Sequence, residues 1–162
     1  MRQVELLSSR EIPRTDLVAF FSQIGVKHEE NPYNLSPYFL HTGEHSVWID
    51  LDIIEERYPE PAIDALTEQK LGGLPQTQIL LHISRGPESE ALAIGFACQF
   101  AEHWPCVVDN LSGRVRRIYS AQELRQLQKE GRGLWDDDQL APFPKDEGED
   151  KSFMHFLNEN DE

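Results

Sequence analysis

The stretch HTGEH at positions 41–45 matches the H-x-x-E-H signature of one class of zinc peptidases. In those enzymes two histidines one helical turn apart bind the metal ion, and the glutamate acts as a general base. The signature requires a helix, because residues i and i+4 share one face there. The apolar residues that follow, Val47, Ile49 and Leu51, instead alternate with polar residues, which is typical of a half-buried strand.

This alternation favours a β-hairpin with Thr42-Gly43 as its two-residue turn, because glycine accepts the positive φ that such turns need. His41 would then pair with Glu44 and Leu40 with His45, and paired residues point to the same side of a sheet. The two histidines would therefore lie on opposite faces, and we predict no zinc-peptidase site. The buried face would hold Tyr38, Leu40, Val47, Ile49 and Leu51, and the opposite face Phe39, His41, Glu44, Trp48, Asp50 and Asp52.

Asp50 and Asp52 would project to one face of the second strand beside Trp48. Two such carboxylates can bind a divalent ion or exchange protons with a substrate, although a solvated strand face has the same pattern. A third interpretation is a protein interface, because Trp buries a large area while carboxylates meet Arg or Lys. Glu55 and Glu56 extend the acidic stretch.

A second aromatic and acidic run consists of Trp135, Asp136, Asp137 and Asp138, and it is either a charged loop or another contact surface. It lies in residues 132–162, which contain three basic and ten acidic residues and so carry half of the net charge.

Close to the end of the chain, Phe153, Met154, Phe156 and Leu157 make this acidic stretch more apolar than a disordered tail usually is. We therefore expect a domain at 1–131 and an acidic C-terminal segment at 132–162 that docks on it.

The chain has no phosphate-binding loop, dinucleotide-binding G-x-G-x-x-G, nucleophile elbow or C-x-x-C pair. Its six histidines are scattered without the spacing of metal ligands. Cys98 and Cys106 lie in apolar runs and are expected to be buried free thiols. We therefore predict no cofactor, no metal site and no catalytic residue.

Periodicity and turn signals predict the elements that position these residues. Thr15 can cap a helix that buries Leu17, Phe20, Phe21 and Ile24 and ends at Gly25. Ser120 and Glu123 have the spacing of a capping box for the last helix, which ends at Gly131. The other expected elements are a strand at 3–8, the hairpin, a helix at 61–71 with Ala62, Ile63, Leu66 and Leu71 inward, a strand at 76–84, a buried helix within 89–104, and a hairpin formed by 106–109 and 114–119.

Hairpins imply antiparallel pairing, and strands and helices interleave without regular strand-helix units. The predicted fold class is therefore α+β: a single domain whose mixed or antiparallel sheet carries helices mainly on one face. The order of the first elements follows a ferredoxin-like plan.

The formal net charge is −14, from 15 Lys and Arg against 29 Asp and Glu. Such a charge repels nucleic acid and anionic membranes and attracts a basic protein, although it can also serve solubility alone. The basic cluster Arg114, Arg116 and Arg117 is expected to pair with carboxylates of the chain itself. No apolar stretch has the length of a membrane span or of a signal-peptide core, so we expect a cytoplasmic protein.

The chain is short and acidic and has no cofactor motif. Towards its end it contains WPCVVDN, a turn and RVRRIYSAQEL. In this overall character the chain resembles bacterial immunity proteins, which neutralise cognate toxins. The resemblance assigns no role to any specific residue of this chain. It implies a non-catalytic inhibitor that occludes the active site of a basic toxin such as a nuclease. Candidate contact residues are Trp48, Asp50, Asp52, Glu55, Glu56, Trp135, Asp136, Asp137 and Asp138.

Two alternatives stay open. One is a metal-dependent hydrolase that uses Asp50 and Asp52. The other is a regulatory domain that responds to a small molecule, and this alternative depends on analogy between folds.

Overall fold

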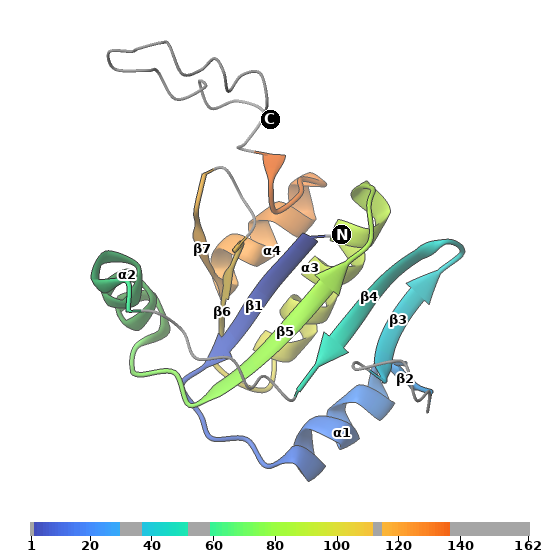
Figure 1. Ribbon diagram of the computed structural model, residues 1–162, viewed down its shortest axis with the longest axis horizontal. Coiled ribbons are helices and arrows are strands. Elements are labelled where there is room, and N and C mark those ends of the chain that lie inside the picture. The colour runs from blue at the N-terminus through green and yellow to red at the C-terminus, as the bar shows by residue number, and fades with distance from the viewer. Residues whose placement is uncertain (1, 30–36, 52–58, 112–114, 137–162) are drawn as a thin grey trace.

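The computed structural model describes residues 2–29, 37–51, 59–111 and 115–136 (Figure 1). In these ranges the chain forms β1 (Arg2–Ser8), α1 (Arg14–Gln23), β2 (Lys27–His28), β3 (Tyr38–Thr42), β4 (His45–Asp50), α2 (Pro61–Leu71), β5 (Thr77–Ile83), α3 (Pro87–Ala101), β6 (Val107–Asp109), β7 (Ile118–Ser120) and α4 (Ala121–Glu130).

The strands form one sheet in the order β2-β3-β4-β5-β1-β6-β7, and every neighbouring pair is antiparallel. The predicted fold class, a single α+β domain, is confirmed. Successive side chains of a strand point to opposite faces, so each face has its own set of residues.

Three helices, α1, α3 and α4, share their core with one face of the sheet, which we call the helical face. The strands contribute alternate residues to it, such as Leu6 of β1 and Leu81 of β5. Phe20 of α1 packs edge-on against Phe96 and Phe100 of α3, with ring centroids 5.9 and 5.8 Å away. Helix α3 is buried, as its apolar sequence predicts.

Helix α2 packs on the other face of the sheet, which we call the second face (Figure 1). Its inward residues meet Leu7, Val107 and Ile118, which come from β1, β6 and β7. Ile63, Leu66 and Leu71 point inward as predicted, but Ala62 is exposed, and Thr67 is buried instead. The Thr67 hydroxyl can lie inside because it donates to the carbonyl of Ile63 at 2.8 Å.

The ferredoxin-like comparison is wrong at the level of strand order. That plan contains split β-α-β units, in which two parallel strands flank a third strand. Here two strands, β4 and β5, lie between β1 and β3, and all neighbours are antiparallel, so β1 and β3 are not the parallel pair of such a unit. The local order of elements was right, but strand pairing is a tertiary property.

The hairpin of β3 and β4 forms as predicted, but its turn is one residue later. Thr42 pairs with His45, so Gly43 and Glu44 form the turn in place of Thr42 and Gly43. Gly43 has a φ of 59° and takes the first central position, where a type II′ turn needs a positive φ. The predicted faces are still correct. The partner of each residue is two positions later than predicted, and residues two apart in a strand point to the same face.

Two helix starts differ from the sequence signals: α3 begins at Pro87, before the predicted range 89–104, and α1 begins before Thr15. Ser120 and Glu123 form the predicted capping box, and Gly25 and Gly131 have positive φ angles after their helices. Thr15, however, lies inside α1, and Pro13 is the N-cap residue without a side-chain hydrogen bond. The prediction failed because proline can itself fix an extended entry to the helix.

Candidate functional site

The second face of the sheet carries a row of aromatic and polar side chains away from α2. The strand register places Phe39 beside Trp48, Trp48 beside His82, and His82 beside Gln3. We call these four residues the aromatic row. The ring centroids of Phe39 and Trp48 are 4.9 Å apart, and Gln3 Nε2 lies 3.2 Å from His82 Nδ1. Both large rings are half-buried.

The next row across the same face is acidic and runs from Asp50 past Leu80 to Glu5 and Asp109. Glu5 is 4% exposed, and one of its carboxylate oxygens accepts a hydrogen bond from Gln78 at 3.0 Å. A buried carboxylate is tolerated when such partners replace water.

Asp109 is fully buried and pairs with Arg116, which donates Nε and Nη2 to its two oxygens at 2.6 and 2.8 Å. The hydrogen bonds to Asp109 raise the pKa of Arg116, which also contacts Glu60. The predicted pairing of this basic cluster with carboxylates of the chain is confirmed for Arg116. Asp109 is therefore neutralised inside the protein, whereas Asp50 is only half-buried.

The structure places Trp48 and Asp50 on the same face, as the alternation predicted. Asp52, Glu55 and Glu56 lie outside the described residues. Strand pairing places Phe39 and His82 on either side of Trp48. The sequence predicted that Phe39 lies on this face, because it belongs to the same hairpin. It did not predict that His82 lies beside Trp48.

Trp135 does not form part of an exposed contact surface. Its side chain is 3% exposed, belongs to the core of the helical face, and lies under the guanidinium of Arg2 at 4.6 Å. Two hydrogen bonds hold the backbone next to it, because Tyr119 Oη and Asn110 Nδ2 both donate to the carbonyl of Leu134. The aromatic side chain was assigned to a surface because the aspartates after it are polar, but tertiary contacts bury the ring.

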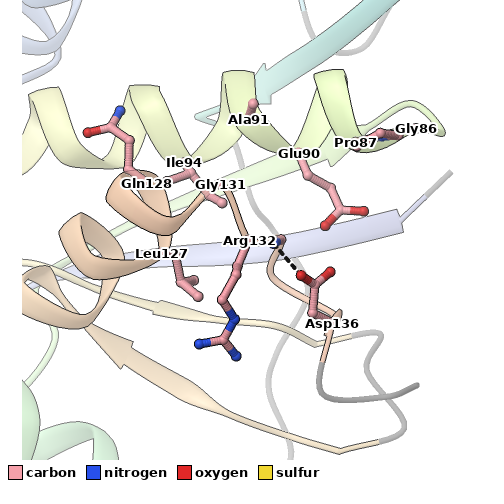
Figure 2. Close-up of a pocket in the computed structure, with 11 residues that line it drawn as sticks. Gly86, Pro87, Glu90, Ala91, Ile94, Leu127, Gln128, Gly131, Arg132 and Asp136 are labelled. Atoms are coloured by element: carbon pink, nitrogen blue, oxygen red, sulfur yellow. Dashed lines mark hydrogen bonds between the residues drawn. The ribbon is translucent and has the colours of Figure 1, made fainter. Parts of the chain in front are cut away.

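Asp136, in contrast, lines a groove of about 440 Å³ between α3 and the end of α4 (Figure 2). We call it the α3–α4 groove. Its residues are Gly86, Pro87, Glu90, Ala91, Ile94, Leu127, Gln128, Gly131, Arg132, Gly133 and Asp136. Asp137 and Asp138 lie outside the described residues. No sequence signal pointed to Glu90, because an acidic residue in the first turn of a helix is common.

Glu90 connects α3 to the chain after α4. Its Oε1 accepts a hydrogen bond from the backbone N–H of Leu134 at 3.0 Å. Burial raises the pKa of Glu90, and the nearby charge of Asp136 adds to this effect, while the hydrogen bond from Leu134 and the charge of Arg2 oppose it. The carboxylate of Glu90 is thus held in place at an electrostatic cost.

The two histidines of HTGEH point to opposite faces, as predicted. His41 stacks on Phe39 on the second face, while His45 lies on the other side and approaches Glu88 at 3.6 Å. Among the described residues, no group of three His, Cys, Asp or Glu side chains is arranged to hold a metal ion. Cys98 and Cys106 are buried free thiols, as expected.

In the part of the chain that the structure describes, no helix has the length and apolar character needed to cross a membrane. No protein-family model matches the chain, and no significant match was found among curated proteins or among solved structures. Among the described residues, the aromatic row and the α3–α4 groove are two features that could bind another molecule.

Proposed function

We propose that this chain is a non-catalytic cytoplasmic binding protein of the immunity type, which neutralises a basic toxin such as a nuclease by covering its active site. The observation that supports this proposal is the aromatic row, in which Phe39 and Trp48 remain half-buried on the second face beside Asp50. Large aromatic side chains that stay accessible on a sheet are typical centres of protein interfaces.

The charge of the chain complements such a partner. A net charge of −14 accelerates encounter with a positively charged protein, and the effect weakens as salt screens it. After encounter, rings that lose their contact with water would determine the lifetime of the complex. The proposed partner is therefore basic, and its association rate should depend strongly on salt.

A pull-down from the lysate of the source organism tests this proposal. The tagged full-length chain should capture a basic protein at low salt and release it at high salt, because exposed charges are screened. The captured protein is then purified, and its own activity is measured with one equivalent of the chain. We expect this activity to be lost in the complex.

Matched variants locate the contact. We expect Trp48→Ala to weaken binding at least ~30-fold, as at an interface hot spot, and Asp50→Lys to slow association. Val18→Ala and Asp16→Lys are the controls, because Val18 and Asp16 are exposed on α1. Capture that resists salt, or binding that all four variants weaken equally, would contradict the proposal.

The metal-dependent hydrolase alternative has no support among the described residues, because Asp50 is not part of a three-ligand cluster there and Asp52 lies outside them. The alternative of a regulatory domain that responds to a small molecule is favoured by one observation, the α3–α4 groove. Its volume is within the range of pockets that bind small molecules.

A further inference from the structure

The α3–α4 groove combines an apolar wall with two carboxylates. Pro87, Ala91 and Ile94 of α3 form one side, and Leu127 of α4 forms the other. Glu90 and Asp136 add their carboxylates, which point toward one another across the groove, while the guanidinium of Arg132 points away (Figure 2). The cavity of about 440 Å³ therefore has an apolar body and two carboxylates at one end.

The two carboxylates converge on the α-carbon of Gly133. A methyl group added there would overlap Glu90 Oε1 and would meet Asp136 Oδ1 at 3.0 Å. Backbone groups fix both side chains, since Leu134 N–H donates to Glu90 and Gly133 N–H donates to Asp136 Oδ2 at 2.9 Å. The absence of a side chain at Gly133 thus leaves room for both carboxylates beside its α-carbon.

Two cations also lie near this end of the groove. Arg2 stacks on the ring of Trp135 and attracts Glu90, and Arg132 forms an ion pair with Glu130 at 3.2 Å. The pKa of Glu90 remains raised by burial in spite of Arg2, and the proximity of Asp136 adds to the rise. Two like charges near each other in a partly buried site are relieved by a cation placed between them.

We propose that the α3–α4 groove binds a small organic cation, with an ammonium group between the carboxylates of Glu90 and Asp136 and an apolar body against Ile94 and Leu127. An ammonium has three N–H donors and can serve both carboxylates at once. Ca²⁺ and Mg²⁺ take six or more oxygen ligands, which this apolar wall does not offer, and no group of three His, Cys, Asp or Glu among the described residues could hold another metal ion. The inference does not depend on the proposed protein partner.

The test is a titration of the ¹⁵N-labelled full-length chain followed by two-dimensional NMR. The probes are hexylamine, which is an ammonium at neutral pH, and hexan-1-ol, which has a similar shape without charge. Saturable shifts of the Gly133 and Leu134 amide signals are expected with hexylamine at about 1 mM. Hexan-1-ol should bind at least about tenfold more weakly, because a charged hydrogen-bonding group is lost.

Three variants separate this site from diffuse attraction to an acidic protein. Asp136→Asn and Glu90→Gln keep an oxygen acceptor for the backbone and should each weaken hexylamine about tenfold. Asp16→Asn removes the same charge from exposed α1 and should leave the affinity unchanged. If Glu90→Gln does not fold, Asp136→Asn decides the result.

Equal binding of hexylamine and hexan-1-ol would overturn the assignment of a cation. Equal weakening by Asp16→Asn and Asp136→Asn, or shifts that never saturate, would overturn the site itself. Because hexylamine is tested on the isolated chain, none of these results bears on capture of a basic protein through the aromatic row.

Discussion

At the scale of single residues, carboxylates of the same chemistry have different tasks because their surroundings differ. Asp109 is buried and neutralised by Arg116, and its task is structural. Glu90 is held by the backbone at the edge of a groove. Asp50 is half-buried next to the aromatic row. Burial and partners, more than residue type, determine which carboxylate can meet another molecule.

Glu90 and Glu123 should affect stability with opposite signs as pH changes. Burial raises the pKa of Glu90 above 4.5, so this carboxyl group binds its proton more tightly in the folded chain than in the unfolded chain. The contribution of Glu90 to the free energy of unfolding therefore falls as pH rises from 4.5 through the raised pKa. Burial also acts to raise the pKa of Glu123, but hydrogen bonds from Lys70 and the Ser120 N–H outweigh it and lower the pKa. The stability from Glu123 is present above 4.5 and is lost as pH falls through its lowered pKa.

Urea unfolding of Glu90→Gln and Glu123→Gln over a pH series measures both effects. Relative to the unsubstituted chain, Glu90→Gln should gain stability as pH rises above 4.5. Glu123→Gln should lose relative stability as pH rises toward 4.5 from below. Parallel pH profiles of the two variants would show that these assignments are wrong.

At the scale of elements, side chains near a helix end matter where they reach unpaired backbone groups. Ser120 Oγ accepts from the N–H of Glu123 at 3.1 Å, and Glu123 Oε1 accepts from the N–H of Ser120 at 2.8 Å. The start of α1 has no such pair, because Pro13 occupies the cap position. The two helices are therefore stabilised differently at their first turns.

We expect Ser120→Ala to lower the free energy of unfolding by about 1 kcal/mol, the usual contribution of a lost N-cap. Thr15→Ala is the matched control, because Thr15 is exposed inside α1 and makes no cap bond. It should be neutral or slightly stabilising, since alanine has the higher helix propensity. Both values come from urea unfolding, and an equal loss in the two variants would contradict the assigned cap.

At the scale of the whole molecule, the two faces of the sheet are covered differently. Helices α1, α3 and α4 complete the core on the helical face, whereas α2 covers the second face only over β1, β6 and β7. The aromatic row lies beside this covered area, on β3, β4, β5 and β1, and Figure 1 shows that β3 and β4 are far from α2. The asymmetry gives two similar tryptophans opposite roles, one in the core and one on a surface.

Trp135→Ala should lower the free energy of unfolding by about 3–5 kcal/mol, because it empties a buried site. Trp48→Ala should cost only about 1 kcal/mol, since its ring is only partly buried. Urea unfolding followed by circular dichroism compares the two variants. A larger loss for Trp48→Ala would mean that the second face is a core and not a contact surface.

The sequence by itself determined most local features of this protein. Alternation of apolar residues identified the faces of β3 and β4, the Ser120 and Glu123 spacing identified the start of α4, and Gly131 identified its end. These features depend on residues a few positions apart, whose geometry the backbone fixes locally. The same alternation predicted that His41 and His45 lie on opposite faces, and they do.

The tertiary structure alone decided which distant residues meet. Strand order brought His82 beside Trp48, and the packing of α3 against the chain after α4 brought Glu90 to Asp136 and buried Trp135. No pattern in the sequence carries this information, because it depends on strand pairings and helix contacts between segments about 30 to 45 residues apart. For the same reason the sequence gives the net charge of this protein, but only the fold shows which aromatic and charged residues lie together on a surface.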